Sequence, residues 1–242
     1  MLTGLYSAGS AMEAASKRHD VVAQNLANAQ MPGYRRLGTM HVSRESQFAD
    51  HLRELVQFEI QGVNAETICT DFTPGPLQRT DNPLDLAIQG EGFFVIEGPQ
   101  GPLYTRNGSF QLDASGMLMT ADQLPVAGQI TLPPGTSLSE VQVATDGTIY
   151  AGAIQVGKIE IVTFPDLQKL QPVGASIYAA PPDLPAMPAS GMILQNMREA
   201  SNVSPIHELV ELIAAQRQHE AAQRSMNAIS EAVGRYINSS MR

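Results

Sequence analysis

The sequence predicts an α+β fold in which long N- and C-terminal helices pair as a coiled coil around a central antiparallel β-rich domain of sandwich or barrel-like type. Two observations predict it: each end carries apolar residues at alternating spacings of three and four, and the middle carries short apolar runs separated by turn residues. The 242 residues are enough for one such domain with appended helices.

The first predicted helical segment covers residues 1–31. Its apolar positions follow the a/d spacing of a coiled coil. Met31-Pro32-Gly33 is a stop signal, because proline disfavours helix at the residue before it. The predicted seam consists of Leu5, Ala8, Met12, Ala15, His19, Val22, Leu26 and Ala29.

The second predicted helical segment covers residues 200–242 and has the same spacing. Ser204 is a suitable N-cap, and Pro205 suits the first helical position. The two segments are therefore assigned to one terminal helical domain. The second seam consists of Leu212, Ala215, His219, Ala222, Met226, Ile229, Val233 and Tyr236.

Residues 82–190 are predicted to form the β-rich domain. Asn107-Gly108 lies between two strand-like runs and predicts a hairpin. Further turns are predicted at Asp113–Gly116 and at Asp146-Gly147. Strands are expected at 117–120, 126–131, 141–144, 148–151 and 154–163.

Two connections complete the predicted organisation. Residues 32–81 are interpreted as an extended connecting arm with a short helix at 47–57. Residues 181–199 are interpreted as a return linker, because its first half is rich in proline and therefore semi-rigid.

No pattern in the sequence predicts catalysis, a cofactor or a metal. His207-Glu208 begins like a zinc-protease helix, but Glu211 occupies the position of the second histidine ligand. Gly90-Glu91-Gly92 lacks the third glycine of a dinucleotide fingerprint and leads into a strand. The sequence therefore predicts a structural protein and not an enzyme.

Composition excludes further classes. The net charge is −9, with the acid concentrated in the middle of the chain, which is unlike the clustered basic face of a nucleic-acid-binding protein. The single cysteine, Cys69, cannot form an intrachain disulfide. The sequence has neither a secretory signal pattern nor an apolar run long enough for a membrane span, which alone would predict a cytoplasmic protein.

Four segments closely resemble bacterial flagellar rod and hook proteins, in order along essentially the whole chain. The first is the N-terminal signature around Asn25, Leu26, Ala27, Asn28, Pro32, Gly33 and Tyr34. The others resemble the start of the family's β domain at 82–94, its hairpin at 104–110 and the lead-in to its C-terminal helix at 199–203.

This resemblance implies an axial subunit of the flagellum that polymerises helically into the rod, with terminal helices as an inner tube and the β domain as an outer layer. It implies export as an unfolded chain through the flagellar type III apparatus without a cleaved signal, and location in the periplasm-spanning rod instead of the cytoplasm. Implied partners are the chain itself, other rod proteins including hook-side subunits, the export apparatus and outer-membrane ring proteins.

The resemblance is strongest to the proximal-rod paralogue, because only about fifty residues separate Tyr34 from Pro83. The distal-rod paralogue is the alternative, and a soluble, non-polymerising binding module is the alternative from another class. If the terminal helices run antiparallel, His19 and His219 are expected to lie close together and to make the seam pH-sensitive. The expected subunit-interface residues are Leu5, Met12, Val22, Leu26, Leu209, Leu212, Ile213, Ile229 and Val233.

Overall fold

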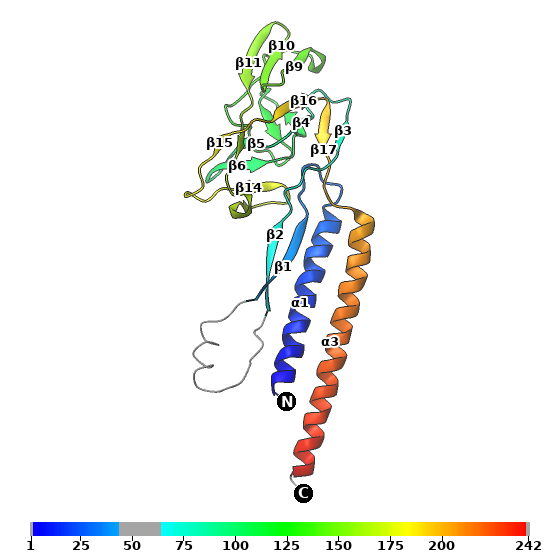
Figure 1. The fold of residues 1–242 in the computed structure, drawn as a ribbon. Coiled ribbons are helices and arrows are strands. Elements are labelled where there is room, and N and C mark those ends of the chain that lie inside the picture. The colour runs from blue at the N-terminus through cyan, green and yellow to red at the C-terminus, as the bar shows by residue number, and fades with distance from the viewer. Residues whose placement is uncertain (1, 44–63, 241–242) are drawn as a thin grey trace. The chain divides into compact units, whose positions relative to one another are not determined.

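The structure, a computed structural model, describes residues 2–43 and 64–240 (Figure 1). The chain divides into two compact units, which are described separately. Because each unit is built from separated stretches, the chain passes from one unit to the other four times. Unit 1 consists of Met1–Ala27, Leu37–Thr70 and Ser204–Arg242, and unit 2 consists of Asn28–Arg36 and Asp71–Val203.

Two antiparallel helices form most of unit 1. Helix α1 spans Leu2–Ala27, and helix α3 spans Pro205–Ser240. The start of α3 agrees with the sequence: proline occupies the first helical position, and the Glu208 N–H donates to the Ser204 carbonyl oxygen at 3.0 Å. The side chains of Arg18 and Glu211 form an ion pair between the two helices.

A two-stranded antiparallel ribbon completes unit 1. Strand β1 (Leu37–Ser43) pairs with β2 (Asn64–Thr70), from Leu37 opposite Thr70 to Ser43 opposite Asn64. An isolated ribbon of this kind is marginally stable in water, and here both strands contact α1. These strands occupy described parts of the region interpreted as a connecting arm, and the short helix expected at 47–57 lies outside the described residues.

Unit 2 is built from several small antiparallel sheets. The largest has six strands in the order β13-β14-β6-β5-β12-β15, and a second has three in the order β11-β10-β9. Three two-stranded sheets pair β16 with β4, β17 with β3 and β7 with β8. The strands are β3 (Leu77–Arg79), β4 (Leu86–Gln89), β5 (Phe93–Gly98), β6 (Gly101–Thr105), β7 (Phe110–Leu112), β8 (Leu118–Thr120), β9 (Val141–Val143), β10 (Thr148–Ala151), β11 (Ile154–Lys158), β12 (Ile161–Thr163), β13 (Gln171–Pro172), β14 (Ile177–Ala179), β15 (Met187–Pro188), β16 (Met192–Gln195) and β17 (Met197–Glu199). Two short 3₁₀ helices cover Leu138–Glu140 and Leu167–Lys169.

Adjacent residues on β5 point into two different apolar clusters, because successive side chains of a strand face opposite sides of the sheet. Phe94 packs edge-on against Phe110 in an otherwise aliphatic cluster that includes Leu86 and Ile149. Phe93 belongs to an aromatic cluster, whose buried members are Phe93, Val95, Tyr104, Phe164, Leu170, Tyr178 and Leu184. Unit 2 therefore has an apolar layer on each face of its central strand.

The predicted turns at Asp113–Gly116 and Asp146-Gly147 are confirmed, with Gly116 and Gly147 at positive φ. The hairpin predicted at Asn107-Gly108 is wrong, because β6 pairs with β5 and β14 whereas β7 pairs with β8. The Asn107 side chain instead accepts a hydrogen bond from the Ser109 N–H at 3.0 Å, which turns the chain from one sheet to another. The strand expected at 126–131 is also wrong, since this segment makes only isolated bridges.

The predicted fold class is wrong for the β body. Unit 2 contains open sheets in place of a sandwich or barrel. Its described strands are two to six residues long, and the chain leaves one sheet for another at half of the steps from one strand to the next. The sequence shows that many short strands exist, but it does not show which of them pair.

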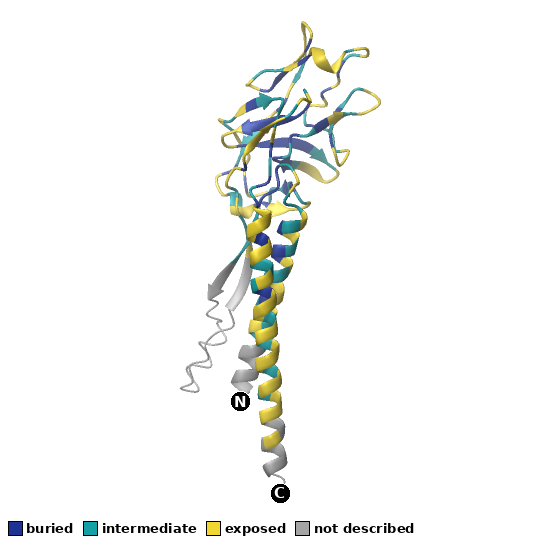
Figure 2. Ribbon diagram, turned by 90° about the vertical axis from the view of Figure 1, so that its right-hand side faces the viewer, coloured by how far each residue is buried: buried dark blue, intermediate teal, exposed yellow. Residues whose placement is uncertain are grey.

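The predicted long coiled-coil pair is also wrong. Among described side chains, the buried apolar residues of α1 are Ala15, Val21 and Val22, and Ala215 is the only one in α3. The helices have unequal lengths of 26 and 36 residues, and most of α3 is exposed (Figure 2). Alanine-rich 3-4 spacing satisfies the sequence pattern but gives little side-chain volume to bury. Neither helix, within the described residues, is apolar over a stretch long enough to cross a membrane.

Candidate functional site

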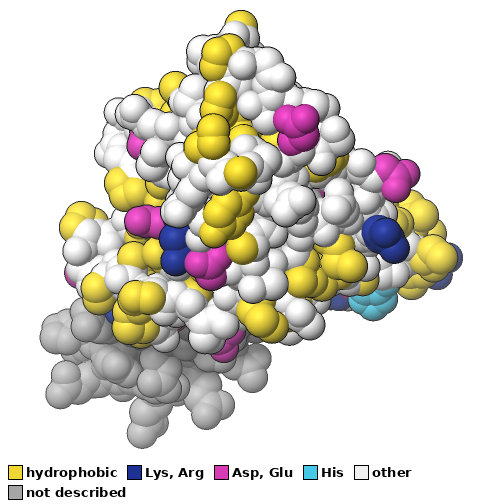
Figure 3. All heavy atoms as spheres, turned by 90° about the horizontal axis from the view of Figure 1, so that it is seen from above, with side chains coloured by type: hydrophobic (Ala, Val, Ile, Leu, Met, Phe, Trp, Pro, Cys, Tyr) yellow, Lys and Arg dark blue, Asp and Glu magenta, His cyan; other side chains and the backbone are white. Residues whose placement is uncertain are grey.

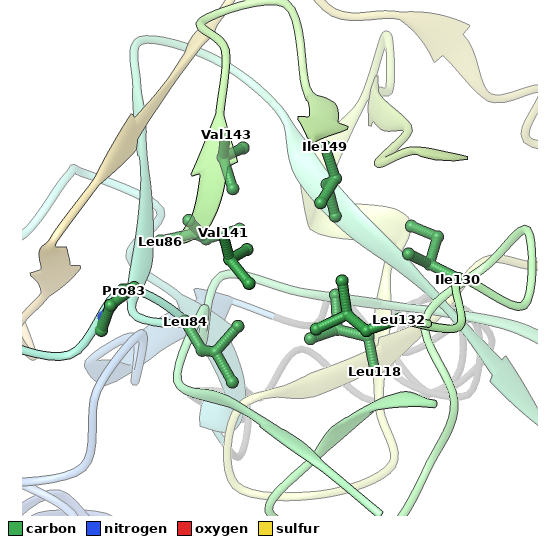
Figure 4. Close-up of a pocket in the computed structure, with 9 residues that line it drawn as sticks. All are labelled: Pro83, Leu84, Leu86, Leu118, Ile130, Leu132, Val141, Val143 and Ile149. Atoms are coloured by element: carbon green, nitrogen blue, oxygen red, sulfur yellow. The ribbon is translucent and has the colours of Figure 1, made fainter. Parts of the chain in front are cut away.

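The part of the chain that the structure describes brings no three His, Cys, Asp or Glu residues together as a metal site. A small apolar pocket in unit 2 has a volume of about 10 Å³, roughly the space of one water molecule, and its lining offers almost no polar partner. It is therefore a packing gap. Its lining residues are Pro83, Leu84, Leu86, Leu118, Ile130, Leu132, Val141, Val143 and Ile149 (Figure 4).

Asn25 connects three elements of unit 1. Its side chain is fully buried, donates to the Leu37 carbonyl oxygen at 2.8 Å and accepts from the Leu37 N–H at 2.9 Å. The same amide nitrogen donates to the carboxylate of Glu208 at 3.2 Å. Asn25 thereby fixes the end of α1 to the start of β1 and to the first turn of α3.

Glu208 is the buried acidic partner in this arrangement. It lies in the first turn of α3, where the partial positive charge of the helix N-terminus stabilises a carboxylate. One turn later, Glu211 pairs with Arg18 of α1. Unit 1 therefore joins its two helices by polar contacts at two successive turns of α3.

Gly33 occupies a tight turn in unit 2 and has φ of 69°. Its N–H donates to the Glu199 carbonyl oxygen at 2.8 Å. A Cβ at this position would come within 2.3 Å of the Asn107 backbone nitrogen. Both the backbone conformation and the close approach therefore require glycine here.

Unit 2 also contains a buried ionic cluster, which begins with Arg35, two residues after Gly33. Arg35 and Glu199 are each 1% exposed and form an ion pair at 2.7 Å. Arg35 also donates to the Thr73 carbonyl oxygen at 2.6 Å, and the Glu199 carboxylate accepts from the Gly75 N–H at 3.0 Å. We call Arg35, Glu199 and Arg106 the buried triad.

Arg106 is the second cation of the buried triad. Its guanidinium lies 3.4 Å from the Glu199 carboxylate, donates to the Gly90 carbonyl oxygen at 2.9 Å and lies 5.3 Å from the centroid of the Phe93 ring. Burial lowers the pKa of Arg106 to about 10, whereas the Glu199 carboxylate raises it and the Arg35 charge lowers it. Arg106 therefore remains charged at neutral pH, and the triad holds two cations around one anion.

Asn202 adds a second connection close in sequence to Glu199. Its side-chain oxygen accepts from the Arg36 N–H at 2.7 Å, and its amide nitrogen donates to the carbonyl oxygens of Asp71 at 2.9 Å and Thr73 at 3.1 Å. Together with the buried triad, it joins three segments of unit 2 that are distant in sequence. These contacts hold the chain in place and present no activated nucleophile or acid–base pair.

The family-signature residues fall in both units. Asn25, Leu26 and Ala27 belong to unit 1, and Asn28 and the later residues belong to unit 2. Asn25, Gly33 and Tyr34 are buried, Ala27 is exposed, and Leu26, Asn28 and Pro32 are half-buried.

The expected subunit-interface residues differ in how far they are buried. Val22 is buried, whereas Met12, Leu26, Leu212 and Ile229 are half-buried. Leu209 and Ile213 are exposed by 47% and 51%. Leu5 lies in α1 and Val233 in α3, and the structure does not describe their side chains.

The expected proximity of His19 and His219 is wrong. Arg18 is level with Glu211 and Asn25 with Glu208, so His19 is level with a residue near 210 to 214. At 1.5 Å per residue, His219 lies roughly 8–14 Å farther along α3. The two histidines therefore do not lie at the same level of the helix pair.

Residue spacing does not single out Arg35, Arg106, Glu199 or Glu208 as buried charged residues. A signal was available for three of them, since Arg35, Arg106 and Glu199 lie within or beside the segments that resemble the family. Their pairing depends on which sheets meet, and residue spacing does not report that.

The surface of unit 2 carries no large cluster of one charge on the face drawn in Figure 3. Charged side chains there lie singly or in small groups, and hydrophobic side chains form a narrow ridge. In the three-stranded sheet, Tyr150 and Ile154 are exposed by 36% and 62%.

Known flagellar protein families match three consecutive regions of the chain. Residues 5–35 match a family described as flagella basal body rod protein, 87–151 match the flagellar hook protein FlgE/F/G D1 domain, and 194–239 match the flagellar basal body rod FlgEFG protein C-terminal region. The matched regions contain Asn25, Arg35, Arg106 and Glu199.

Individual relatives that match most of the chain are rod proteins as well. The flagellar basal-body rod protein FlgF of Caulobacter vibrioides is 35% identical over 217 residues, covering 88% of this chain and 87% of the relative. FlgF of Salmonella typhimurium is 31% identical, with 96% and 95% covered. FlgG of Caulobacter vibrioides is 32% identical, with 90% and 92% covered. The chain therefore belongs to the flagellar basal-body rod protein family.

Proposed function

We propose that this protein is a proximal-rod-type structural subunit of the flagellar basal body, polymerising helically into the drive shaft that crosses the periplasm. The similarity to a rod protein named FlgF, at 35% identity over 88% of the chain, carries the proposal. The short connection between the N-terminal signature and the β-rich unit also favours the proximal type. The distal type, represented by FlgG relatives at 28% to 32% identity, is the second candidate.

In this proposal the two helices of unit 1 contribute to an inner tube, and unit 2 contributes to an outer layer. Leu5, Met12, Val22, Leu26, Leu212, Ile229 and Val233 contribute to the helical layer, together with Leu209 and Ile213. The half-burial of several of these residues supports this role, because neighbouring subunits would complete their burial. Residues 34–81 would connect successive subunits.

The proposal includes a structural role without catalysis. Each buried charged side chain described above has a partner side chain or backbone group, although the Nε atoms of Arg35 and Arg106 donate to no partner among the described residues. This pairing supports a mechanical function. It also includes export through the flagellar type III apparatus without a cleaved signal, and contact with other rod proteins and with outer-membrane rings.

Electron microscopy of basal bodies from a strain lacking this gene tests the proposal. A missing or shortened rod and loss of swimming are expected, and the length of the remaining stub separates the proximal from the distal type. Complete rods and hooks in that strain would contradict the proposal and favour a non-polymerising binding module.

A further inference from the structure

Asn107-Gly108 is the only place in the sequence where glycine follows asparagine. The pair lies in unit 2 between β6 and β7, where it does not form the hairpin that its composition predicts. A glycine in this position makes the preceding asparagine chemically labile, because no Cβ hinders the approach of the glycine nitrogen to the asparagine side chain. The pair is therefore a candidate site of covalent change.

The reaction needs only water as a co-reactant. The backbone nitrogen of Gly108 loses its proton and attacks the side-chain carbonyl carbon of Asn107; the amide nitrogen leaves as ammonia, and a succinimide ring closes. Water then opens the ring. Breaking the bond to the side-chain carbon gives aspartate, and breaking the bond to the backbone carbon gives isoaspartate, in which the main chain is longer by a methylene group. The overall change exchanges ammonia for water.

The folded chain holds the asparagine side of this reaction in place. The Asn107 N–H donates to the Thr105 Oγ1 at 3.0 Å, and the Asn107 side-chain oxygen accepts from the Ser109 N–H at 3.0 Å. Ring closure needs rotation of the Asn107 side chain about its Cα–Cβ bond and of the backbone about ψ. Either rotation displaces the side chain or Ser109 from the hydrogen bond that joins them, so the native geometry opposes the attack.

The glycine side is held on both of its flanks. The Gly108 carbonyl oxygen accepts from the Leu86 N–H at 2.9 Å and from the Phe110 N–H at 3.1 Å. Gly108 is buried, and Asn107 is half-buried. The peptide group that contains the attacking nitrogen therefore turns toward the side chain only when the surrounding hydrogen bonds open, which makes unfolding the route to reaction.

Isoaspartate at this position does not fit unit 2. The Asn107 backbone nitrogen packs against Gly33, where a Cβ would come within 2.3 Å of it. Gly108 packs against Leu86, and a Cβ on Gly108 would lie 1.8 Å from the Leu86 carbonyl oxygen. An additional methylene group in the main chain between Asn107 and Gly108 must push one of these two close contacts apart.

Aspartate, in contrast, is compatible with the same surroundings. It leaves the length of the main chain unchanged, and its carboxylate accepts the hydrogen bond from the Ser109 N–H as the amide oxygen of Asn107 does. The reaction thus gives one product that unit 2 accommodates and one that it does not.

We infer that Asn107-Gly108 is a site of spontaneous deamidation that the folding of unit 2 closes, and that isoaspartate formed there in the unfolded chain prevents unit 2 from folding. The inference goes beyond the proposed function and does not depend on it, because the reacting groups and the close contacts belong to unit 2 itself. Its consequence is a chemical time limit: the longer a chain waits unfolded, the smaller is the fraction that can build unit 2.

Peptide mapping of the full-length protein tests the protection by the fold. The protein is incubated at mildly alkaline pH in native buffer and, in parallel, in guanidinium chloride, and is then digested in mild acid with a glutamate-specific protease. The released peptide 98–140 contains Asn107 as its only asparagine, and electron-transfer fragmentation distinguishes isoaspartate from aspartate. Isoaspartate is expected to form at least about tenfold faster in the denaturant, because the reaction requires opening of the fold. Equal rates, or no isoaspartate in the denaturant, overturn the inference.

Refolding tests the consequence for unit 2. Chains incubated in guanidinium chloride are returned to native buffer and treated briefly with a protease, which removes chains that have not refolded. The resistant unit 2 is expected to contain asparagine and aspartate at position 107 but to be depleted of isoaspartate at least about tenfold relative to the digested fraction. Equal isoaspartate in the two fractions overturns the inference.

Two variants separate the added methylene from other changes. Asn107→Ser removes the reactive amide and retains a side-chain oxygen that can accept from the Ser109 N–H, so it is expected to recover all of its unit 2 after the same incubation. Asn107→Asp is expected to refold as the wild type does. A loss of unit 2 in Asn107→Ser equal to that in the wild type, or failure of Asn107→Asp to refold, would show that isoaspartate is not the cause and would overturn the inference.

Discussion

Replacing the anion of the buried triad should destabilise unit 2 more than any single surface change. Glu199→Gln retains the shape of the side chain but removes its charge. The change leaves Arg35 and Arg106 buried near each other without the carboxylate that contacts both of them. Both side chains are at least 94% buried. Burial of an uncompensated charge is among the few mechanisms that give large mutational effects.

The expected magnitude follows from measurements on buried ion pairs. Removing one partner of such a pair typically costs about 3–5 kcal/mol. Unit 2 is of ordinary domain size, for which a urea m value of about 2 kcal/mol/M is reasonable. Glu199→Gln should therefore lower the urea midpoint of unit 2 by about 2 M.

Tyrosine fluorescence during urea unfolding of the full-length protein measures this midpoint. The chain has no tryptophan, and Tyr34, Tyr104 and Tyr178 are all buried in unit 2. Following the helical circular dichroism signal in parallel reports unit 1. If the fluorescence and circular dichroism signals change at different urea concentrations, each transition gives the midpoint of one unit.

Arg106→Met is the internal comparison. It leaves Arg35 and Glu199 as one cation with one anion, so its cost should be clearly smaller than that of Glu199→Gln. Glu211→Gln is the external comparison: its ion pair with Arg18 is 25% to 35% exposed, and such pairs contribute about 0–1 kcal/mol. A Glu199→Gln midpoint within 0.5 M of wild type, on the order of 1 kcal/mol at this m value, would refute the argument that charge compensation holds the triad together.

Three further predictions concern single positions. Gly33→Ala should destabilise unit 2 by several kcal/mol because it adds a backbone clash to an unfavourable φ, whereas Gly152→Ala, with φ of 61° and open space around it, should cost about 1 kcal/mol in the same urea assay. Asn25→Ala should lower the midpoint of the helical signal by about 1 M, since it removes two hydrogen bonds to the half-buried Leu37 backbone; an unchanged midpoint would show that water replaces the amide. Hydrogen bonds from Ser115 hold the pKa of Asp113 below its ordinary 3.8, so this contribution to stability is present above pH 4 and is lost as the pH falls below it; Asp113→Asn should remove that part of the acid dependence, and an acid unfolding curve identical to wild type would contradict it.

The sequence was informative where structure is set locally. The turns at Asp113 and Asp146 follow from aspartate and glycine chemistry within four residues, and the structure contains both. The start of α3 follows from Ser204 and Pro205 in the same way. Most of the strands predicted between residues 117 and 163 are also present in unit 2.

The sequence was less informative where structure depends on distant partners. Asn107-Gly108 has the composition of a hairpin turn, but a Cβ on Gly108 would lie 1.8 Å from the Leu86 carbonyl oxygen. This glycine therefore permits close packing against another strand and not a reversal of the chain. The 3-4 spacing likewise identified two helices without showing how little of that seam would be buried.

The two buried polar pairs link residues near the start of the chain, at 25–35, to residues near its end, at 199–208. In unit 1, Asn25 meets Glu208; in unit 2, Arg35 meets Glu199. Each unit therefore joins a residue from the start of the chain to one near its end, across at least 164 positions. Contacts of such large sequence separation require the entropy of closing a long loop before they stabilise anything. Neither unit can complete its buried polar pair until residues 199–208 are available, so completion of both units must follow synthesis of nearly the whole chain.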